Sequence, residues 1–176
     1  MFQHFKILMI ATAAATALVP VSASAGAANG NLVAAAMQSQ DHQTLVAAVK
    51  AGGLVDTLAG RGLFTVFAPT DAAFVKLPAG TVDTLLKPAN RDQLRSVLTY
   101  HVVAGKVGSA QLVDAIRKGG GQAMLKTVQG GTLTASLSGN SVVITDAAGG
   151  TATVTKADLV QSNGIIHVTD AVSLPM

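Results

Sequence analysis

The stretch FTVFAPTDAAF, at residues 64–74, joins a predicted buried strand to the start of a helix. Its first five residues are aromatic, β-branched or small, as is typical of a strand inside a sheet. Pro69 is expected to end this strand, because proline has no amide N–H for a further ladder hydrogen bond. Thr70 or Asp71 then supplies a side-chain oxygen to cap the helix that contains Phe74. The sequence therefore predicts that a buried strand is followed directly by a capped helix at this point.

Helical spacing of apolar residues surrounds this stretch in the first half of the chain. One-face patterns, bounded by Asn, Ser, Gly or Pro, occur at residues 32–37, 45–49, 54–58, 82–86, 94–98 and 112–116. Asn90 is predicted to cap the helix over 94–98, with Gln93 in the reciprocal capping position. Ser109 is predicted to cap the last helix. Residues 100–103 are predicted to form a strand that Gly105 terminates.

The second half of the chain shows the two-residue period of β-strands. Apolar and hydroxyl side chains alternate over 132–137, and β-branched runs follow at 141–145, 151–155 and 165–169. Turns are expected at 138–140 and 146–150. A further segment begins at Val160 and breaks at Asn163-Gly164. Helices followed by strands predict an α+β domain.

The N-terminus has the layout of a secretory signal peptide. Lys6 precedes an almost wholly apolar run over 7–19, and the small residues VSASA follow at 21–25. Cleavage is predicted after Ala25, with Ala23 and Ala28 as alternatives. This divides the chain into a signal peptide (1–25), a short segment (26–30) and one domain (31–176), and predicts a secreted or periplasmic protein.

The composition excludes several classes of protein. There is no cysteine, hence no disulfide, no thiolate metal site and no lipoprotein anchor. Removing Lys6 leaves eleven scattered basic residues against nine Asp, which speaks against nucleic acid as a partner. No second apolar stretch after the N-terminal run is long enough to span a membrane.

Three segments in order resemble the fasciclin domain. They are FTVFAPTDAAF at 64–74, LTYHVVAGKV at 98–107 and NGIIHVTDAVSLP at 163–175, of which the first and last are similar to the two signatures of the family. The resemblance covers residues 31–176, and in layout the chain is most similar to secreted mycobacterial fasciclin-like antigens. It implies a wedge of two β-sheets with several helices packed at one side. Thr169 and Ser173 depart from the aliphatic residue and the leucine common in the family. The residues that carry the structural signature are Phe67, Pro69, Thr70, Asp71, Phe74, Gly164, His167, Asp170 and Pro175.

The resemblance also implies adhesion without catalysis. In animal relatives the Tyr-His pair and its aliphatic neighbours are implicated in integrin binding, which makes a candidate adhesion surface of Leu98, Tyr100, His101, Val102 and Val103. The alternative is that both rings belong to the core. The expected partner is a cell-surface or matrix protein, a glycan or a lipid, and the expected state is a monomer. A second hypothesis is that the protein carries a small apolar ligand. A sizeable closed pocket would favour the carrier, whereas a flat exposed apolar patch would favour the adhesin.

The sequence shows no catalytic set, cofactor motif or metal-ligand spacing. No G-x-S-x-G, phosphate loop or dinucleotide fingerprint is present. His42, His101 and His167 are the histidines of the predicted domain, and a structural, hydrogen-bonded role is expected for His167. Asp71 is expected to cap a helix, and Asp170 to tie the last strand to a backbone donor. Three apolar strands, marked by Phe67, Val102 and Val168, are expected to share a single core.

Overall fold

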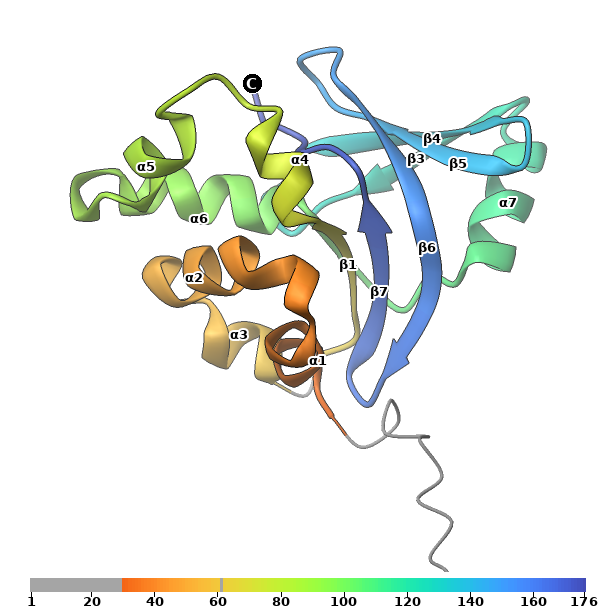
Figure 1. Ribbon diagram of the computed structural model, residues 1–176. Helices are drawn as coiled ribbons and strands as arrows, with labels where there is room; N and C mark the ends of the chain where they lie inside the picture. The colour runs from red at the N-terminus through yellow and green to blue at the C-terminus, as the bar shows by residue number, and fades with distance from the viewer. Residues whose placement is uncertain (1–29, 61) are drawn as a thin grey trace, which may run out of the picture.

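Seven strands form a sheet of order β2-β1-β7-β6-β5-β4-β3 in the computed structural model, which describes residues 30–60 and 62–176. The long strand β6 pairs with β7 at one end and with β5 at the other, so it belongs to both parts of the wedge (Figure 1). An isolated bridge between Val103 and Thr127 brings the two ends of the sheet together. The predicted signal peptide lies outside the described residues. The strands are β1 (Phe64–Pro69), β2 (Val102–Ala104), β3 (Gln122–Lys126), β4 (Thr132–Ser138), β5 (Ser141–Thr145), β6 (Thr151–Gln161) and β7 (Gly164–Thr169).

Six of the helices gather on one side of β1 and β7, and α7 lies beside β3, β4 and β5 (Figure 1). This arrangement confirms the predicted α+β wedge with helices at one side. No helix of the described ranges is both long and apolar enough to cross a bilayer. The helices are α1 (Leu32–Gln38), α2 (Gln43–Gly52), α3 (Val55–Ala59), α4 (Asp71–Val75), α5 (Thr81–Leu86), α6 (Arg91–Tyr100) and α7 (Ser109–Lys118), with 3-10 turns η1 (Gln40–His42) and η2 (Pro88–Asn90).

Strand β1 brings the three signature segments together. It pairs antiparallel with β2 and parallel with β7, where Phe67 lies opposite His167. The expectation of one shared core is wrong, however, because β1 is covered on both faces. Val102 and Val168 pack under the helices, whereas Phe67 points the other way, since neighbouring residues of a strand face opposite sides.

Each face of β1 therefore has its own hydrophobic core. The first lies between the sheet and helices α1–α3, α5 and α6, and Leu45, Leu54 and Leu94 are among its buried residues. The second lies between the two parts of the sheet, with Leu133 and Ile144 fully shielded and Leu112 of α7 closing it. A strand buried on both faces typically has a nearly continuous apolar sequence, as residues 64–68 do apart from Thr65.

Several predicted boundaries differ from the structure. Tyr100 is the last residue of α6 and His101 caps it, so neither belongs to β2. Asn90 makes no side-chain cap and donates instead to the Thr84 carbonyl at 2.8 Å. Gly108, not Ser109, is the N-cap of α7. Pro69 does end β1 as predicted, and it is the last residue of β1 that pairs with β7.

One strand of the structure was not predicted, and another is longer than predicted. Strand β3 was not predicted at all, and β6 runs on through Val160 to Gln161. Register shifts interrupt β6 between Val154 and Leu159, where Asp158 has a positive φ of 59°. Such irregularity disrupts the two-residue pattern and explains why the sequence suggested two separate segments.

Candidate functional site

The predicted adhesion surface is buried in this structure. Its members lie at the end of α6 and in β2, and each is at most 5% exposed. They form no outer surface in this conformation, and their part in binding stays a prediction. The residues are Leu98, Tyr100, His101, Val102 and Val103.

Tyr100 connects α6 to the far part of the sheet. Its hydroxyl donates to the Thr132 carbonyl at 2.8 Å and accepts the Ala147 N–H at 3.0 Å. The ring leaves no room beside it, because a Cβ on Gly131 would stand 2.8 Å from the Tyr100 ring. This side chain therefore fixes the relative position of a helix and two β-turn regions.

His101 connects α6 to the C-terminal segment. The ring donates from Nδ1 to the Val97 carbonyl at 2.8 Å, and Nε2 accepts the Ser173 N–H at 3.0 Å. Because Nε2 accepts, the ring is neutral with its proton on Nδ1. Burial lowers the pKa of His101, more than the Val97 carbonyl and Asp146 raise it.

We expect stability to fall when the pH drops below about 6.5, the ordinary pKa of histidine. Below that value the unfolded chain takes up a proton at His101 and the folded chain does not, so unfolding is favoured until the lowered folded pKa is reached. One such group contributes at most about 1.4 kcal/mol per pH unit. Urea unfolding at pH 7.5 and 5.5 measures this loss.

His101→Gln is expected to reduce that loss, because glutamine does not titrate. His42, whose pKa burial also lowers, contributes in the same direction, so part of the pH dependence remains. Equal losses in the wild type and in His101→Gln would show that His101 is not the group responsible.

His167 is buried inside the wedge and both of its ring nitrogens are hydrogen-bonded. Nε2 donates to the Val107 carbonyl at 2.8 Å, and Nδ1 accepts the Asp158 N–H at 3.3 Å. The ring stacks on Phe67 with centroids 5.5 Å apart. His167 thus holds β1, β7, the bulge of β6 and the segment before α7 in one arrangement.

Ser109, Asp158 and His167 lie close together without forming a catalytic relay. The hydroxyl and the N–H of Ser109 both donate to the Asp158 carboxylate, which lowers the pKa of Asp158. The His167 ring accepts the Asp158 backbone N–H at one nitrogen and donates to the Val107 carbonyl from the other, so no ring nitrogen is available to take a proton from the Ser109 hydroxyl. Within residues 30–60 and 62–176, no three His, Asp or Glu side chains group as a metal site would require.

The two oxygen-bearing residues after β1 have separate roles. Thr70 Oγ1 accepts the Ala73 N–H at 3.2 Å and caps α4, as predicted. Asp71 instead accepts the Thr44 N–H at 2.8 Å and the Gln43 N–H at 3.3 Å, so it caps α2. Burial raises the pKa of Asp71, but these hydrogen bonds outweigh it and the net shift is downward.

The remaining signature residues lie at the two ends of the last strand and near the helices. Asp170 Oδ1 accepts the Thr153 N–H at 2.8 Å, and its carboxylate lies 3.9 Å from Lys76 Nζ. Phe74 packs against the helix-side core, and Pro175 is half-buried near the C-terminus. Gly164 faces the backbone of β1, where a Cβ would stand 2.0 Å from the Phe64 carbonyl oxygen.

Asn163 is an anchoring residue that the sequence marked only as a turn. Its side chain accepts the Leu32 N–H at 2.9 Å and donates to the carbonyls of Leu58, at 2.6 Å, and Gly60, at 3.0 Å. One amide thereby joins α1, the end of α3 and the β6–β7 hairpin. An Asn-Gly pair usually indicates a turn, and nothing in the pattern shows that the amide points inward.

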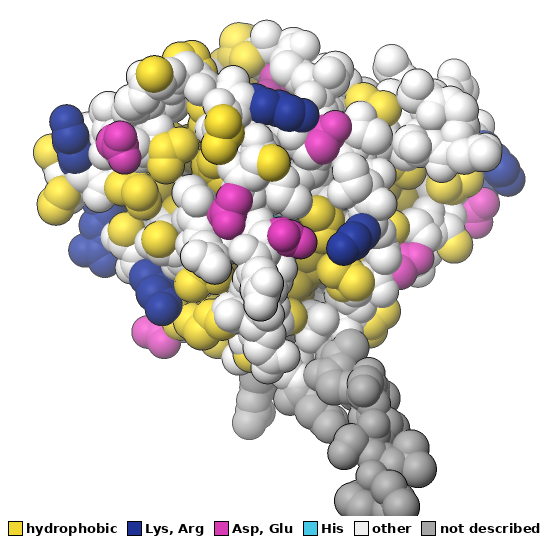
Figure 2. All heavy atoms as spheres, in the orientation of Figure 1, with side chains coloured by type: hydrophobic (Ala, Val, Ile, Leu, Met, Phe, Trp, Pro, Cys, Tyr) yellow, Lys and Arg dark blue, Asp and Glu magenta, His cyan; other side chains and the backbone are white. Residues whose placement is uncertain are grey.

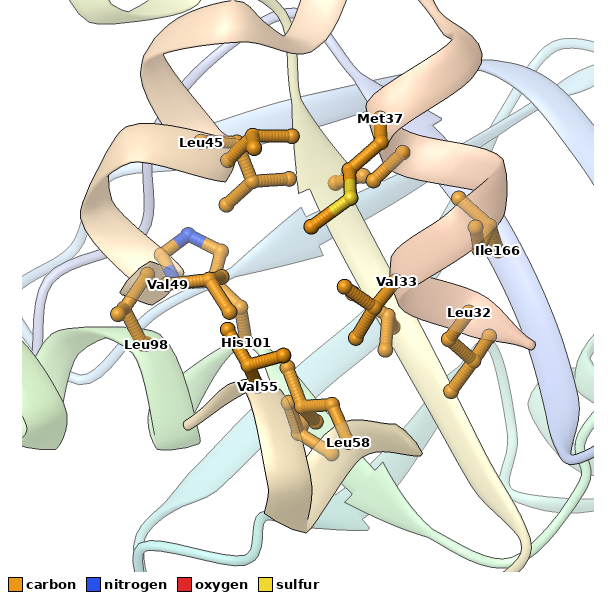
Figure 3. Close-up of a pocket in the computed structure, with 15 residues that line it drawn as sticks. Leu32, Val33, Met37, Leu45, Val49, Val55, Leu58, Leu98, His101 and Ile166 are labelled. Atoms are coloured by element: carbon orange, nitrogen blue, oxygen red, sulfur yellow. The ribbon is translucent and has the colours of Figure 1, made fainter. Parts of the chain in front are cut away.

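A small cavity lies among α1, α2, α3 and the sheet (Figure 3). Its walls are almost wholly apolar, with Val33, Met37 and Leu58 facing Val49 across it and His101 behind. The cavity has a volume of about 40 Å³. Binding pockets for organic ligands usually measure about 300–1,000 Å³, so this is not the sizeable pocket that a carrier would need.

Comparison with known proteins agrees with this architecture. The family model described as Fasciclin domain matches residues 40–175. The Synechocystis protein sll1483 is 44% identical over 144 residues, which are 82% of this chain and 73% of that protein. Immunogenic protein MPB70 of Mycobacterium bovis is 36% identical over 168 residues, which are 93% of this chain and 78% of that protein.

The same fold is found in a solved structure. The FAS1 domain pair of the insect cell adhesion molecule fasciclin I superposes with a TM-score of 0.72 at 19% identity. The match covers 82% of this chain and 51% of that one, as expected for one domain of a pair. The matching family model and these relatives show that this chain belongs to the fasciclin domain family.

Proposed function

We propose that this protein acts outside the cytoplasm by adhesion to a cell-surface or matrix component, without turning over a substrate. The observation that carries the proposal is family membership over residues 40–175, together with the N-terminal stretch that reads as a signal peptide. The structural relative fasciclin I is a cell adhesion molecule, and its fold is shared here. The hydrogen-bonded histidines described above are consistent with a scaffold rather than an active site.

Binding to envelope fractions tests this proposal. Purified protein should sediment with envelope or matrix material from the producing organism and release no chemically altered product. Treating that material with protease, with periodate or with organic solvent identifies the partner as protein, glycan or lipid. Failure to bind any fraction would contradict adhesion as the function.

We further propose that Tyr100 and His101 support the contact surface without forming it. Their buried hydrogen bonds to Thr132, Ala147, Val97 and Ser173 are the support for this. The double variant Tyr100→Phe/His101→Ala is expected to lower the free energy of unfolding by about 2–4 kcal/mol. At a temperature where circular dichroism shows it folded, it should bind envelope material with unchanged affinity. A folded double variant that no longer binds would place the pair in the contact surface.

A further inference from the structure

The chain that follows β7 is an irregular segment, residues 171–176, which we call the C-terminal strap. Figure 1 shows it leaving β7 toward the helices. Among the described residues, no backbone–backbone hydrogen bond holds the strap. Asp170, just before it, is fixed, because it exchanges two hydrogen bonds with Thr153 and its carbonyl accepts Lys76 Nζ–H at 2.8 Å. The strap can therefore move while the end of β7 stays in place.

Two titratable side chains hold the strap through its backbone. His101 Nε2 accepts the Ser173 N–H at 3.0 Å, and Asp146 Oδ2 accepts the next N–H, that of Leu174, at 2.9 Å. The other carboxylate oxygen of Asp146 accepts the Gly150 N–H at 2.7 Å. A backbone N–H can only donate, so the His101 ring must be neutral wherever the strap is bound.

The apolar contacts of the strap are limited. Val172 and Leu174 are half-buried against the helix-side core, and Met176 is 91% exposed. A hollow of about 360 Å³ lies between the end of the strap and helices α5 and α6, with Leu85 and Val97 in its wall. The end of the strap is thus loosely packed, and the two side-chain hydrogen bonds carry a large share of its attachment.

His101 is closed to solvent while the strap is bound. The residue is 3% exposed, and among the described residues no histidine side chain is visible on the face shown in Figure 2. Asp146, on the turn between β5 and β6, is the charged group that acts on the ring, whereas the cavity beside the ring has apolar walls from α1, α2 and β1. Lys76 and Asp170, at the start of the strap, lie 3.9 Å from each other.

We propose that mild acid releases the C-terminal strap while both hydrophobic cores stay folded. A proton on His101 Nε2 removes the acceptor of the Ser173 N–H and sets a second donor against it. The strap then swings away at Ala171, and the apolar side chains of Leu85 and Val97 become more exposed. This switch is separate from the proposed adhesion and does not depend on it.

The sign of the pH effect follows from the two forms of the strap. Burial lowers the pKa of His101 in the bound form, whereas in the released form Nε2 faces solvent and the Asp146 carboxylate, so a pKa of at least about 6.5 is expected. Below that pH the released form takes up a proton and the bound form does not. The ratio of released to bound strap therefore rises toward tenfold per pH unit, until the lowered pKa of the bound form is reached.

Single cysteines measure the release, because the chain has none of its own. Ser173→Cys places a thiol in the strap at a position 4% exposed, Ala135→Cys places one in β4 at 0%, and Met176→Cys is the accessible reference. Each reacts with dithiodipyridine, a disulfide reagent that works in acid, from pH 7.5 to 5.0. Relative to Met176→Cys, the rate at Ser173→Cys is expected to rise at least tenfold. Ala135→Cys, which needs global unfolding, should stay at least a hundredfold slower than Ser173→Cys.

The His101→Gln background is the matched control. Glutamine does not titrate, so the rate at Ser173→Cys should change less than threefold over the same pH range, whatever its level. A tenfold rise in this background would overturn the proposal, as would a constant rate at Ser173→Cys in the wild-type background. If His101→Gln does not fold, the Ala135→Cys comparison still decides, because equal rates at the two positions would show that the strap leaves only when the whole domain unfolds.

Discussion

Replacing Gly164 by alanine is expected to destabilise the protein by about 3–5 kcal/mol, enough to prevent folding in a marginally stable domain. The new Cβ would stand 2.0 Å from the Phe64 carbonyl oxygen and 3.1 Å from the Leu32 side chain. Relief requires β7 to move away from β1, and that movement breaks the parallel ladder at its first pair. Urea unfolding, or the yield of folded protein where none refolds, measures the effect.

Gly30→Ala is the matched control for that substitution. A Cβ on Gly30 meets its nearest neighbour, Ala34 Cβ, at 3.5 Å, which is ordinary van der Waals contact. The control is expected to change stability by less than about 0.5 kcal/mol. If Gly164→Ala were as stable as this control, the tight fit of β7 against β1 would be disproved.

His167→Ala is expected to lower the free energy of unfolding by about 2–4 kcal/mol. The change opens a cavity beside Phe67 and leaves the Val107 carbonyl and the Asp158 N–H without partners. Chemical denaturation at pH 7.5 measures the loss. Adding a metal chelator to the wild type is expected to leave the melting temperature unchanged, because both ring nitrogens already serve backbone groups.

His167→Phe separates the two contributions. The larger ring keeps the stacking on Phe67 but makes neither hydrogen bond, so a loss of about 1–3 kcal/mol is expected. A phenylalanine variant as unstable as the alanine variant would assign the effect to hydrogen bonding alone. A wild type that loses stability with the chelator would instead reveal a metal at His167.

The sequence predicted the elements whose pattern is local. Residues 64–68 and 165–169 formed strands as expected, and the helices over 94–98 and 112–116 lie in α6 and α7. The missed strand β3 has the weakest pattern, because Met124 points outward at 79% exposure and its neighbours include good helix formers. Tyr100 was predicted as part of a strand because residues 100–103 combine an aromatic residue with two β-branched valines.

Roles that depend on distant contacts could not be read from the chain. The carboxylate of Asp71 serves a helix that begins 28 residues earlier, and Asn163 serves one 131 residues away. The two-sided burial of β1 likewise separates Phe67 from Val66 although they are adjacent.

The parallel pairing of β1 with β7 has a consequence for the order of folding. These strands lie about a hundred residues apart, and β7 follows all the other strands in chain order. The core under the helices cannot close fully before β7 has been synthesised, because Ile166 and Val168 of β7 are buried in it. Contacts at such separation slow folding, typically to milliseconds or longer. The helix-side core is therefore expected to stay incomplete during synthesis until β7 has been made, although all of its helices precede that strand by more than sixty residues.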